Sequence, residues 1–390
     1  MTPVSWIYGA VTGTRNWMFD QKILKSEEYD IPVIGVGNLT VGGTGKTPHV
    51  EYIVSHLSKE YKVAVLSRGY KRKTKGFILA NAHSTPTDIG DEPYQIYHKF
   101  KGQVIVATCE SRRKGIDRLQ KLYPDLEVIV LDDSFQHRWV KPKISILLTD
   151  YSRPFYKDKL LPLGRLREGK MQVNRADMVI VTKCPDNLQP INFRIAFKEI
   201  DLMKFQKLFF SRYNYDELKP VFADDAPYAA ELSQFTSEDA VMLLTGIANP
   251  RYIVRYFRSF PFKVKVDHYA DHHSFTKRDI KEIEKKFKAL KGKHKIIVTT
   301  EKDAVRLMHN PYFPKELKPF TFYLPITVKM LKGVEDHDLI EEIKAQIGRK
   351  EVKIESRIET PAEDELKIKK EGEGSYETQK EDDGFDSWMD

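Results

Sequence analysis

Three groups of residues have the types and spacing that phosphoryl transfer requires. The first is the stretch GNLTVGGTGKTPHV at residues 37–50, in which Gly42, Gly43 and Gly45 precede Lys46 and Thr47. A glycine-rich loop of this kind offers backbone N–H donors to phosphate oxygens, a lysine to the outer phosphates and a hydroxyl to Mg²⁺. The candidate nucleotide-binding residues are Thr40, Val41, Gly42, Gly43, Thr44, Gly45, Lys46 and Thr47.

This loop departs from the common phosphate-loop pattern at one position. The pattern places a glycine five residues before the glycine of Gly-Lys-Thr, and Thr40 occupies that position here. The adjacent glycines can still shape the turn, because glycine adopts left-handed backbone conformations without steric cost. A phosphate loop remains the favoured interpretation, with a chance glycine-rich turn as its alternative.

The second group consists of two acids at the end of an apolar run. In LEVIVLDDSFQHR the run ends in Asp132 and Asp133. A carboxylate at the carboxyl end of a strand beside a phosphate loop is the usual partner of the Mg²⁺ that accompanies a nucleotide. Taken alone, an aspartate after a strand is equally typical of a turn.

The third group could supply a general base. The segment DIGDEPYQI places Asp91 and Glu92 just before an amphipathic helical pattern, although acids are also favoured at a helix N-terminus by the macrodipole. A competing interpretation comes from VIVTKCPD, because guanine-binding domains read their base with a lysine and an aspartate after a strand. Pro185 stands where that aspartate is needed, so a guanine-nucleotide switch or a metallochaperone-type NTPase is the alternative rather than the first choice.

The sequence pattern of the elements that must position these groups predicts an α/β fold. Short apolar runs alternate with amphipathic segments between residues 23 and 205, which indicates a P-loop NTPase-like domain with a parallel sheet. A second, smaller α/β domain is expected over 223–349, joined to the first by an extended linker or hinge at 206–222. The predicted strands are IPVIGV, YKVAVLS, QVIVAT, LEVIVLDD, ISILLTD and ADMVIVTK in the first domain, and AVMLLTGI, FKVKVDHY, HKIIVTT and FTFYLPI in the second.

The two ends of the chain have distinct compositions. Residues 1–22 place several apolar side chains near one face of a helix that also carries Trp6 and Trp17, a pattern that fits either an interfacial membrane helix or packing on the protein's own core. Residues 350–390 are highly charged and poor in apolar side chains, so we expect a disordered tail.

Charge and cysteine content narrow the class of protein. Residues 351–390 contain 14 acidic and 6 basic residues, so the other 350 residues carry a net charge of +16, which suits an anionic partner. The interleaving of aromatic and basic residues that is typical of a nucleic-acid groove is missing, and nothing indicates an obligate protein partner. The two cysteines have no disulfide or zinc spacing, and no apolar run or signal sequence indicates a membrane span or export, so a cytoplasmic protein is expected.

Together these motifs resemble the tetraacyldisaccharide 4′-kinase (lipid A 4′-kinase) family. The matching stretches run from residue 5 to 307, and they are SWIYGAVTGTRN, GVGNLTVGGTGKTPHV, LSRGYKR, GDEP, VLDDSFQHR, LPLGRLRE, TGIANP, DHHSF and TTEKDAVRL. The family's own loop lacks the first glycine of the common pattern, which accounts for Thr40. Ser134 is a departure, because family members typically carry glycine there.

The resemblance implies a function and roles for individual residues. It implies transfer of the ATP γ-phosphate to the 4′-hydroxyl of a tetraacylated glucosamine disaccharide 1-phosphate in lipid A biosynthesis, at the cytoplasmic face of the inner membrane, with residues 1–22 at the membrane surface. Lys46 and Arg167 would neutralise charge in the transition state, and Asp91 with His272 would act as the catalytic base. The implied Mg²⁺ ligands are Thr47, Asp132, Asp133 and Glu168.

Overall fold

Nine strands form the larger of two sheets in this computed structural model, which describes residues 3–225, 230–271, 273–332 and 338–348. Its order is β14-β8-β7-β6-β1-β5-β2-β4-β3, and all neighbours are parallel except the edge strands β3 and β14. All six strands predicted for the first domain are present, which confirms the α/β class with a parallel sheet. The bounds are β1 (Val33–Asn38), β2 (Val63–Ser67), β3 (Ile78–Leu79), β4 (Ile105–Thr108), β5 (Val128–Asp132), β6 (Ile144–Asp150), β7 (Met178–Thr182), β8 (Lys207–Tyr215) and β14 (Ile326–Leu331).

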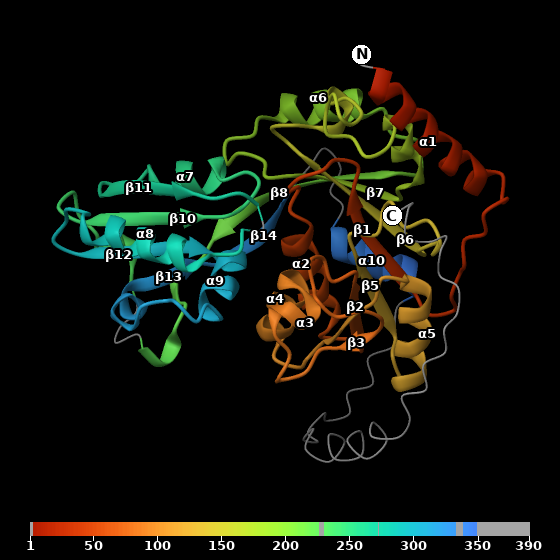
Figure 1. Cartoon of the computed structure of the whole chain (residues 1–390). Helices are drawn as coiled ribbons and strands as arrows, with labels where there is room; N and C mark the ends of the chain where they lie inside the picture. Colours follow the sequence, from red (N-terminus) through yellow and green to blue (C-terminus); the bar gives the residue numbers. More distant parts are fainter. Residues whose placement is uncertain (1–2, 226–229, 272, 333–337, 349–390) are drawn as a thin grey trace. The chain divides into compact units, whose positions relative to one another are not determined.

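Helices cover both faces of this sheet (Figure 1). Alternate residues of a strand point to opposite faces, so Val128 and Val130 of β5 pack in one core while Ile129 and Leu131 pack in another. Burial on both faces explains why these strands read as continuous apolar runs. The helical segments are α2 (Lys46–Leu57), α3 (Pro86–Ile89), α4 (Asp91–Phe100), α5 (Arg112–Leu122) and α6 (Pro190–Ile200), with short 3₁₀ turns η1 (Phe155–Lys157) and η2 (Lys170–Arg175).

A five-stranded sheet forms the second α/β region. Its order is β11-β10-β12-β13-β9, parallel except for β9. Helix α7 packs on one face, and α8 and α9 pack on the other. The bounds are β9 (Lys219–Pro220), β10 (Ala240–Thr245), β11 (Lys263–His268), β12 (Lys295–Thr300), β13 (Thr321–Leu324), α7 (Arg251–Phe257), α8 (Lys277–Lys288) and α9 (Glu301–Met308), with 3₁₀ turns η3 (Ala223–Asp225), η4 (Leu232–Gln234) and η5 (Lys315–Phe320).

The segment predicted as a linker, residues 206–222, is extended but is built into the sheets. Strand β8 pairs with β7 and β14 in the larger sheet, and β9 pairs with β13 in the smaller one. The chain therefore passes between the sheets after β8 and returns before β14. A hinge at these crossings remains a prediction.

The predicted boundary of the second domain, 223–349, is wrong at its C-terminal side. Strand β14 is antiparallel to β8 in the larger sheet, and α10 (Leu339–Ile347) packs beside α2 (Figure 1). The physical reason is the apolar face of α10, whose buried residues join the core of the larger sheet: Leu339, Ile340, Ile343 and Ile347. The predicted tail at 350–390 lies outside the described residues.

The N-terminal helix predicted over 1–22 is present as α1 (Pro3–Asp20). It is held on the body by hydrogen bonds from Ser5 Oγ to the Leu160 carbonyl and from Tyr8 Oη to the Arg167 carbonyl, at 3.2 and 2.9 Å. None of the helices within the described ranges is both long enough and apolar enough to cross a bilayer.

Removal of α10 should destabilise the larger sheet. A chain ending at Lys332 leaves the face of α2 that α10 covers exposed, whereas a chain ending at Gly348 keeps the contact. Each buried aliphatic side chain contributes about 1.5–3 kcal/mol, so the shorter chain should lose more than about 3 kcal/mol of unfolding free energy. Urea unfolding of the two chains measures the difference, and equal midpoints would contradict this account of the core.

Candidate active site

The loop between β1 and α2 has the backbone that a phosphate loop needs. Gly42 and Gly45 adopt left-handed conformations with φ of 109° and 93°, which glycine tolerates without strain. Asn38 at the end of β1 shapes the start of the loop, since its Nδ2 donates to the Thr40 carbonyl at 2.8 Å and to Thr44 Oγ1 at 2.9 Å. These bonds allow a buried threonine to occupy the position where the common pattern has glycine.

A buried histidine holds the other end of the loop. His49 Nδ1 lies 2.7 Å from the Gly45 carbonyl, and Nε2 lies 2.8 Å from Ser211 Oγ on β8. A carbonyl only accepts, so Nδ1 carries the proton and Nε2 accepts from the serine. Burial lowers the pKa of His49 to about 4, which keeps the ring neutral. Sequence reasoning missed this residue, although its spacing of four from Gly45 on a helix was a usable signal.

Lys183 binds the phosphate loop, whereas the corresponding lysine of a guanine-binding domain would contact the base. Its ammonium donates to the Gly43 carbonyl and to Asp150 Oδ2, the latter at 2.9 Å. Tyr252 of α7 donates to the other oxygen of Asp150 at 2.9 Å. Asp186, which a guanine-binding site would turn toward the base, pairs with Arg212. The geometry therefore gives the guanine-nucleotide alternative no support.

The two acids after β5 have opposite electrostatic surroundings. Asp133 lies 3.4 Å from Lys46 Nζ and 3.4 Å from Arg167 Nη1, and these cations lower its pKa to about 2 despite burial. Asp132 is buried, and desolvation together with the charges of Glu92 and Asp133 raises its pKa to about 7. Within the described ranges, Asp132 Oδ1 has no hydrogen-bond partner. A buried, unsatisfied carboxylate oxygen is what a bound cation would satisfy.

Among the described residues, no group of three or more His, Cys, Asp and Glu side chains is arranged to hold a metal ion. This fits Mg²⁺, which usually takes one or two carboxylates together with substrate phosphates and water rather than an all-protein cage. Asp132, Asp133 and the Thr47 hydroxyl are therefore a suitable donor set beside a bound nucleotide.

Arg167 and Glu168 are adjacent in sequence but do not share an environment. Arg167 lines the cleft and also donates to Gln136 Oε1 at 3.1 Å. Glu168 is buried, does not line the cleft, and pairs with Arg175. Arg167 therefore lies in the cleft. Glu168, which was predicted to face the metal, is instead paired with Arg175. Ser134, the departure from the family pattern, has an ordinary negative φ that serine accepts.

The predicted base, Asp91, is the first residue of α4. Helix α9, which packs on the smaller sheet, contacts α4 at this point. Arg306 donates to Asp91 Oδ2 from Nε at 2.8 Å and from Nη2 at 2.6 Å. Lys302 pairs with Glu92 at 3.1 Å. The predicted partner of the base, His272, lies outside the described residues. Sequence reasoning missed Arg306, because the contact joins positions more than 200 residues apart.

Asp303 organises the smaller sheet's side of this contact. It is fully buried, accepts from the Gly246 amide at 2.8 Å and from Thr300 Oγ1 at 2.7 Å, and pairs with Arg306 Nη1 at 2.7 Å. One carboxylate thus holds the N-cap residue of α9, Thr300, together with the start of the loop after β10, and it orients the arginine that reaches Asp91.

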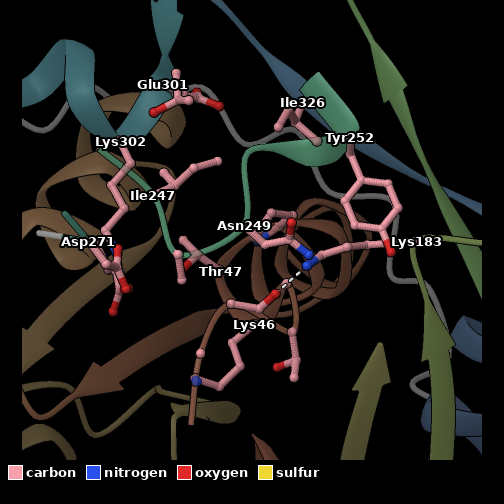
Figure 2. A pocket seen from close by; sticks show the side chains of 18 of the residues that line it. Lys46, Thr47, Lys183, Ile247, Asn249, Tyr252, Asp271, Glu301, Lys302 and Ile326 are labelled. Carbon is pink, nitrogen blue, oxygen red and sulfur yellow. Dashed lines mark hydrogen bonds and ion pairs between the residues drawn. The ribbon is translucent and has the colours of Figure 1, made fainter. Parts of the chain in front are cut away.

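These elements enclose a cleft of about 420 Å³. In Figure 2, Ile247, Asn249 and Tyr252 from the smaller sheet lie across the cleft from Lys46 and Thr47. Its lining from the larger sheet comprises the phosphate loop from Val41 to Pro48, together with Tyr70, Glu92, Gln95, Asp133, Arg167, Lys183, Tyr213, Tyr215 and Ile326. The cleft therefore combines phosphate-binding groups with aromatic and aliphatic walls.

The chain is similar to one protein family across both sheets. A family model described as tetraacyldisaccharide-1-P 4′-kinase matches residues 1–347. The tetraacyldisaccharide 4′-kinases of Bacteroides thetaiotaomicron and Parabacteroides distasonis are each 49% identical to it, over 86% and 84% of this chain and 89% of each relative. The crystal structure of LpxK from Aquifex aeolicus in complex with ATP is 28% identical with a TM-score of 0.64, and the match covers 88% of this chain and 96% of that one.

The charge state of Asp132 can be tested by the pH dependence of stability. With a pKa of about 7, its carboxyl keeps a proton in the folded chain that the unfolded chain releases near pH 4, so stability falls as pH rises from about 4 to 7. Asparagine cannot ionise. The change in unfolding free energy that Asp132→Asn causes should therefore be more favourable at pH 8 than at pH 5, by on the order of 2–3 kcal/mol.

Urea unfolding without nucleotide and magnesium gives this comparison. Asp125→Asn is the control, because that carboxylate is exposed and should give no gain that grows with pH. A stability change for Asp132→Asn that is the same at both pH values would contradict a raised pKa.

Proposed function

The chain belongs to the tetraacyldisaccharide-1-P 4′-kinase family, and on this premise we propose how its cleft transfers the γ-phosphate of ATP to the 4′-hydroxyl of a tetraacylated glucosamine disaccharide 1-phosphate. The chain is therefore an ATP-dependent lipid kinase of lipid A biosynthesis. The observation that carries the proposal is the convergence on one cleft of a phosphate loop, the Lys46–Asp133–Arg167 charge cluster and Glu92 at the start of α4, which Asp91 directly precedes.

The phosphate loop binds and orients the donor. Backbone N–H groups between Gly42 and Thr47 would bind β-phosphate oxygens, and Lys46 on the first turn of α2 would reach the β- and γ-phosphates. The Thr44 N–H is the exception, because it donates to the Gly42 carbonyl at 3.0 Å. Lys46 Nζ is 3.4 Å from Asp133 Oδ1, so its ammonium is held at the mouth of the loop and is preorganised for an anionic ligand.

Thr47, Asp132 and Asp133 are the residues that would hold Mg²⁺, which when bound neutralises charge on the β- and γ-phosphate oxygens. Glu168 is the weakest member of the predicted set, because its carboxylate is already paired with Arg175. Arg167 lines the cleft beside Asp133, and we assign it to charge that develops on the transferred group.

Asp91 is the proposed base for the 4′-hydroxyl proton, and His272 is its proposed partner from the smaller sheet. The Arg306 contact holds the Asp91 carboxylate in one orientation at the boundary between the sheets. A fixed direction positions the carboxylate toward a bound hydroxyl, although the Arg306 charge also lowers its basicity. Approach of the two sheets would also exclude water and limit ATP hydrolysis.

A membrane surface is the proposed place of reaction, at the cytoplasmic face of the inner membrane. Helix α1 turns several apolar side chains outward, with Val4, Ile7 and Val11 about 60% exposed or more, whereas Ser5, Asn16 and Phe19 are buried against the body. This is the reverse of a helix on a water-facing surface. The net charge of +16 on residues 1–350 suits an anionic lipid surface and a phosphorylated acceptor, and neither a nucleic acid nor an obligate protein partner is proposed.

Lys46→Ala should lower transfer to the acylated disaccharide by at least about 100-fold, since it removes the cation that spans the transferring phosphates. Radiolabelled ATP and the acceptor in detergent micelles give the rate. Lys59→Ala, an exposed lysine just beyond the C-terminus of α2, is the matched control and should keep normal activity. Full activity of Lys46→Ala would exclude this loop as the phosphate site.

Asp91→Asn should lower kcat by about 100-fold or more, with little change in the KM for ATP, because a base acts on the acceptor's proton. Glu92→Gln is the matched variant, since it removes the neighbouring ion pair between α4 and α9 and retains Asp91. Steady-state kinetics in micelles separate the two. Equal losses in both variants, or a pure KM effect, would assign Asp91 to the inter-sheet contact alone.

A further inference from the structure

Helix α6 exposes apolar side chains on the side that faces away from the protein. Its inward residues, Phe193, Ala196 and Ile200, follow the spacing of a helix face packed on a core. Ile191 and Ile195, which lie on the opposite side by the same spacing, are 58% and 46% exposed. A surface helix normally carries polar residues there, so packing among the residues that the structure describes does not explain this face.

Exposed apolar residues continue beyond the helix, where Met203 and Phe205 are 44% and 58% exposed. Arg194, Lys198 and Lys204 lie among the exposed apolar residues in sequence. The acids of this segment are Glu199, which is paired with Lys157 at 2.9 Å, and Asp201 at the end of α6. We call Ile191, Ile195, Met203 and Phe205 the α6 apolar surface.

The segment around Leu160 contacts both α1 and the core beneath α6. Leu160 accepts the Ser5 hydrogen bond through its carbonyl and lies against Gly9 of α1, and it also packs on the core beneath α6. The chain between the two helices adds two exposed apolar side chains, Leu163 and Met171. In the view of Figure 1, α1 and α6 both lie above the larger sheet.

We propose that the α6 apolar surface is a second membrane contact, which inserts into the headgroup layer of an anionic bilayer alongside α1. The inference rests on the proposed membrane role of α1, and it adds a docking surface that the catalytic assignment does not require. Single apolar side chains separated by lysine and arginine suit a bilayer interface, because the apolar groups insert while the cations reach lipid phosphates.

A second membrane contact fixes the orientation of the protein on the bilayer, which α1 alone does not. A body attached through one helix can rotate about the helix axis, whereas a second contact fixes the direction in which the cleft faces the lipid acceptor. The second contact also forms at high effective concentration once α1 has bound, so the two affinities multiply. Binding should therefore depend steeply on both surfaces.

Sedimentation with vesicles of phosphatidylglycerol and phosphatidylethanolamine tests the proposal on the full chain. The double variant Ile191→Ser with Ile195→Ser should lower the partition coefficient about tenfold or more, because two inserting aliphatic side chains are lost. Leu122→Ser with Tyr312→Ser, two exposed apolar residues on α5 and after α9, is the control and should bind as the parent does. Unchanged binding of the α6 variant overturns the proposal.

Activity in detergent micelles separates this proposal from the kinase assignment. The α6 variant should retain the parent's kcat/KM for the micellar acceptor and lose rate only when the acceptor is embedded in vesicles. Absence of transfer by the parent chain would refute the kinase assignment and leave the vesicle result standing. Loss of micellar activity in the α6 variant would instead overturn the membrane-contact interpretation.

A site-specific probe tests insertion directly. Cys109 and Cys184 are buried, so Ile195→Cys can be labelled selectively with an environment-sensitive fluorophore. Its emission should shift to the blue on anionic vesicles and be quenched by brominated lipid, whereas a label at Leu122→Cys should not respond. An unchanged spectrum on bound vesicles, or a shift that follows protein concentration without lipid, would overturn the proposal, and the second result would identify a copy of the chain as the occupant.

Discussion

The site depends on hydrogen bonds that buried side chains donate to the carbonyl groups of the phosphate loop. Asn38 donates to the carbonyl of Thr40, Lys183 to that of Gly43, Thr182 to that of Thr44 at 2.7 Å and His49 to that of Gly45. These donors come from β1, β7 and α2, so the sheet itself fixes the loop. Because the carbonyl oxygens are taken, the amide N–H groups are what the loop presents to a phosphate. Preorganisation of this kind costs no rearrangement at the moment of transfer.

The smaller sheet contributes to the same site through a few polar contacts. Asp150 receives both the Lys183 that supports the loop and the Tyr252 hydroxyl from α7, and Asp303 orients the Arg306 that reaches Asp91. These contacts join largely buried groups, and they are few compared with the contacts within either core. Opening between the two sheets as ligands enter remains a prediction, in which these contacts would break while the two cores stay intact. This arrangement suits a kinase whose cleft must admit a nucleotide and a lipid headgroup.

Local sequence was sufficient for the strands, the phosphate loop and the acids after β5, because each depends on a short pattern of burial or backbone geometry. It was insufficient where contacts join distant segments. The return of β14 to the larger sheet depends on pairing with β8, and Asp91 meets an arginine 215 positions away. Glu168 is a further example, since the sequence around it does not reveal its ion pair with Arg175.

The neighbouring acids Asp132 and Asp133 show that the site is strained electrostatically until a cation arrives. Lys46 and Arg167 stabilise the Asp133 carboxylate, whereas Asp132, one residue earlier, is buried where a second negative charge is disfavoured. A single extra cation would let both acids ionise. Replacing Asp132 with an apolar group would relieve the desolvation cost and remove a proposed cation ligand. A buried carboxylate at this point costs stability, so it fits the proposed binding of a cation better than a role in stabilising the fold.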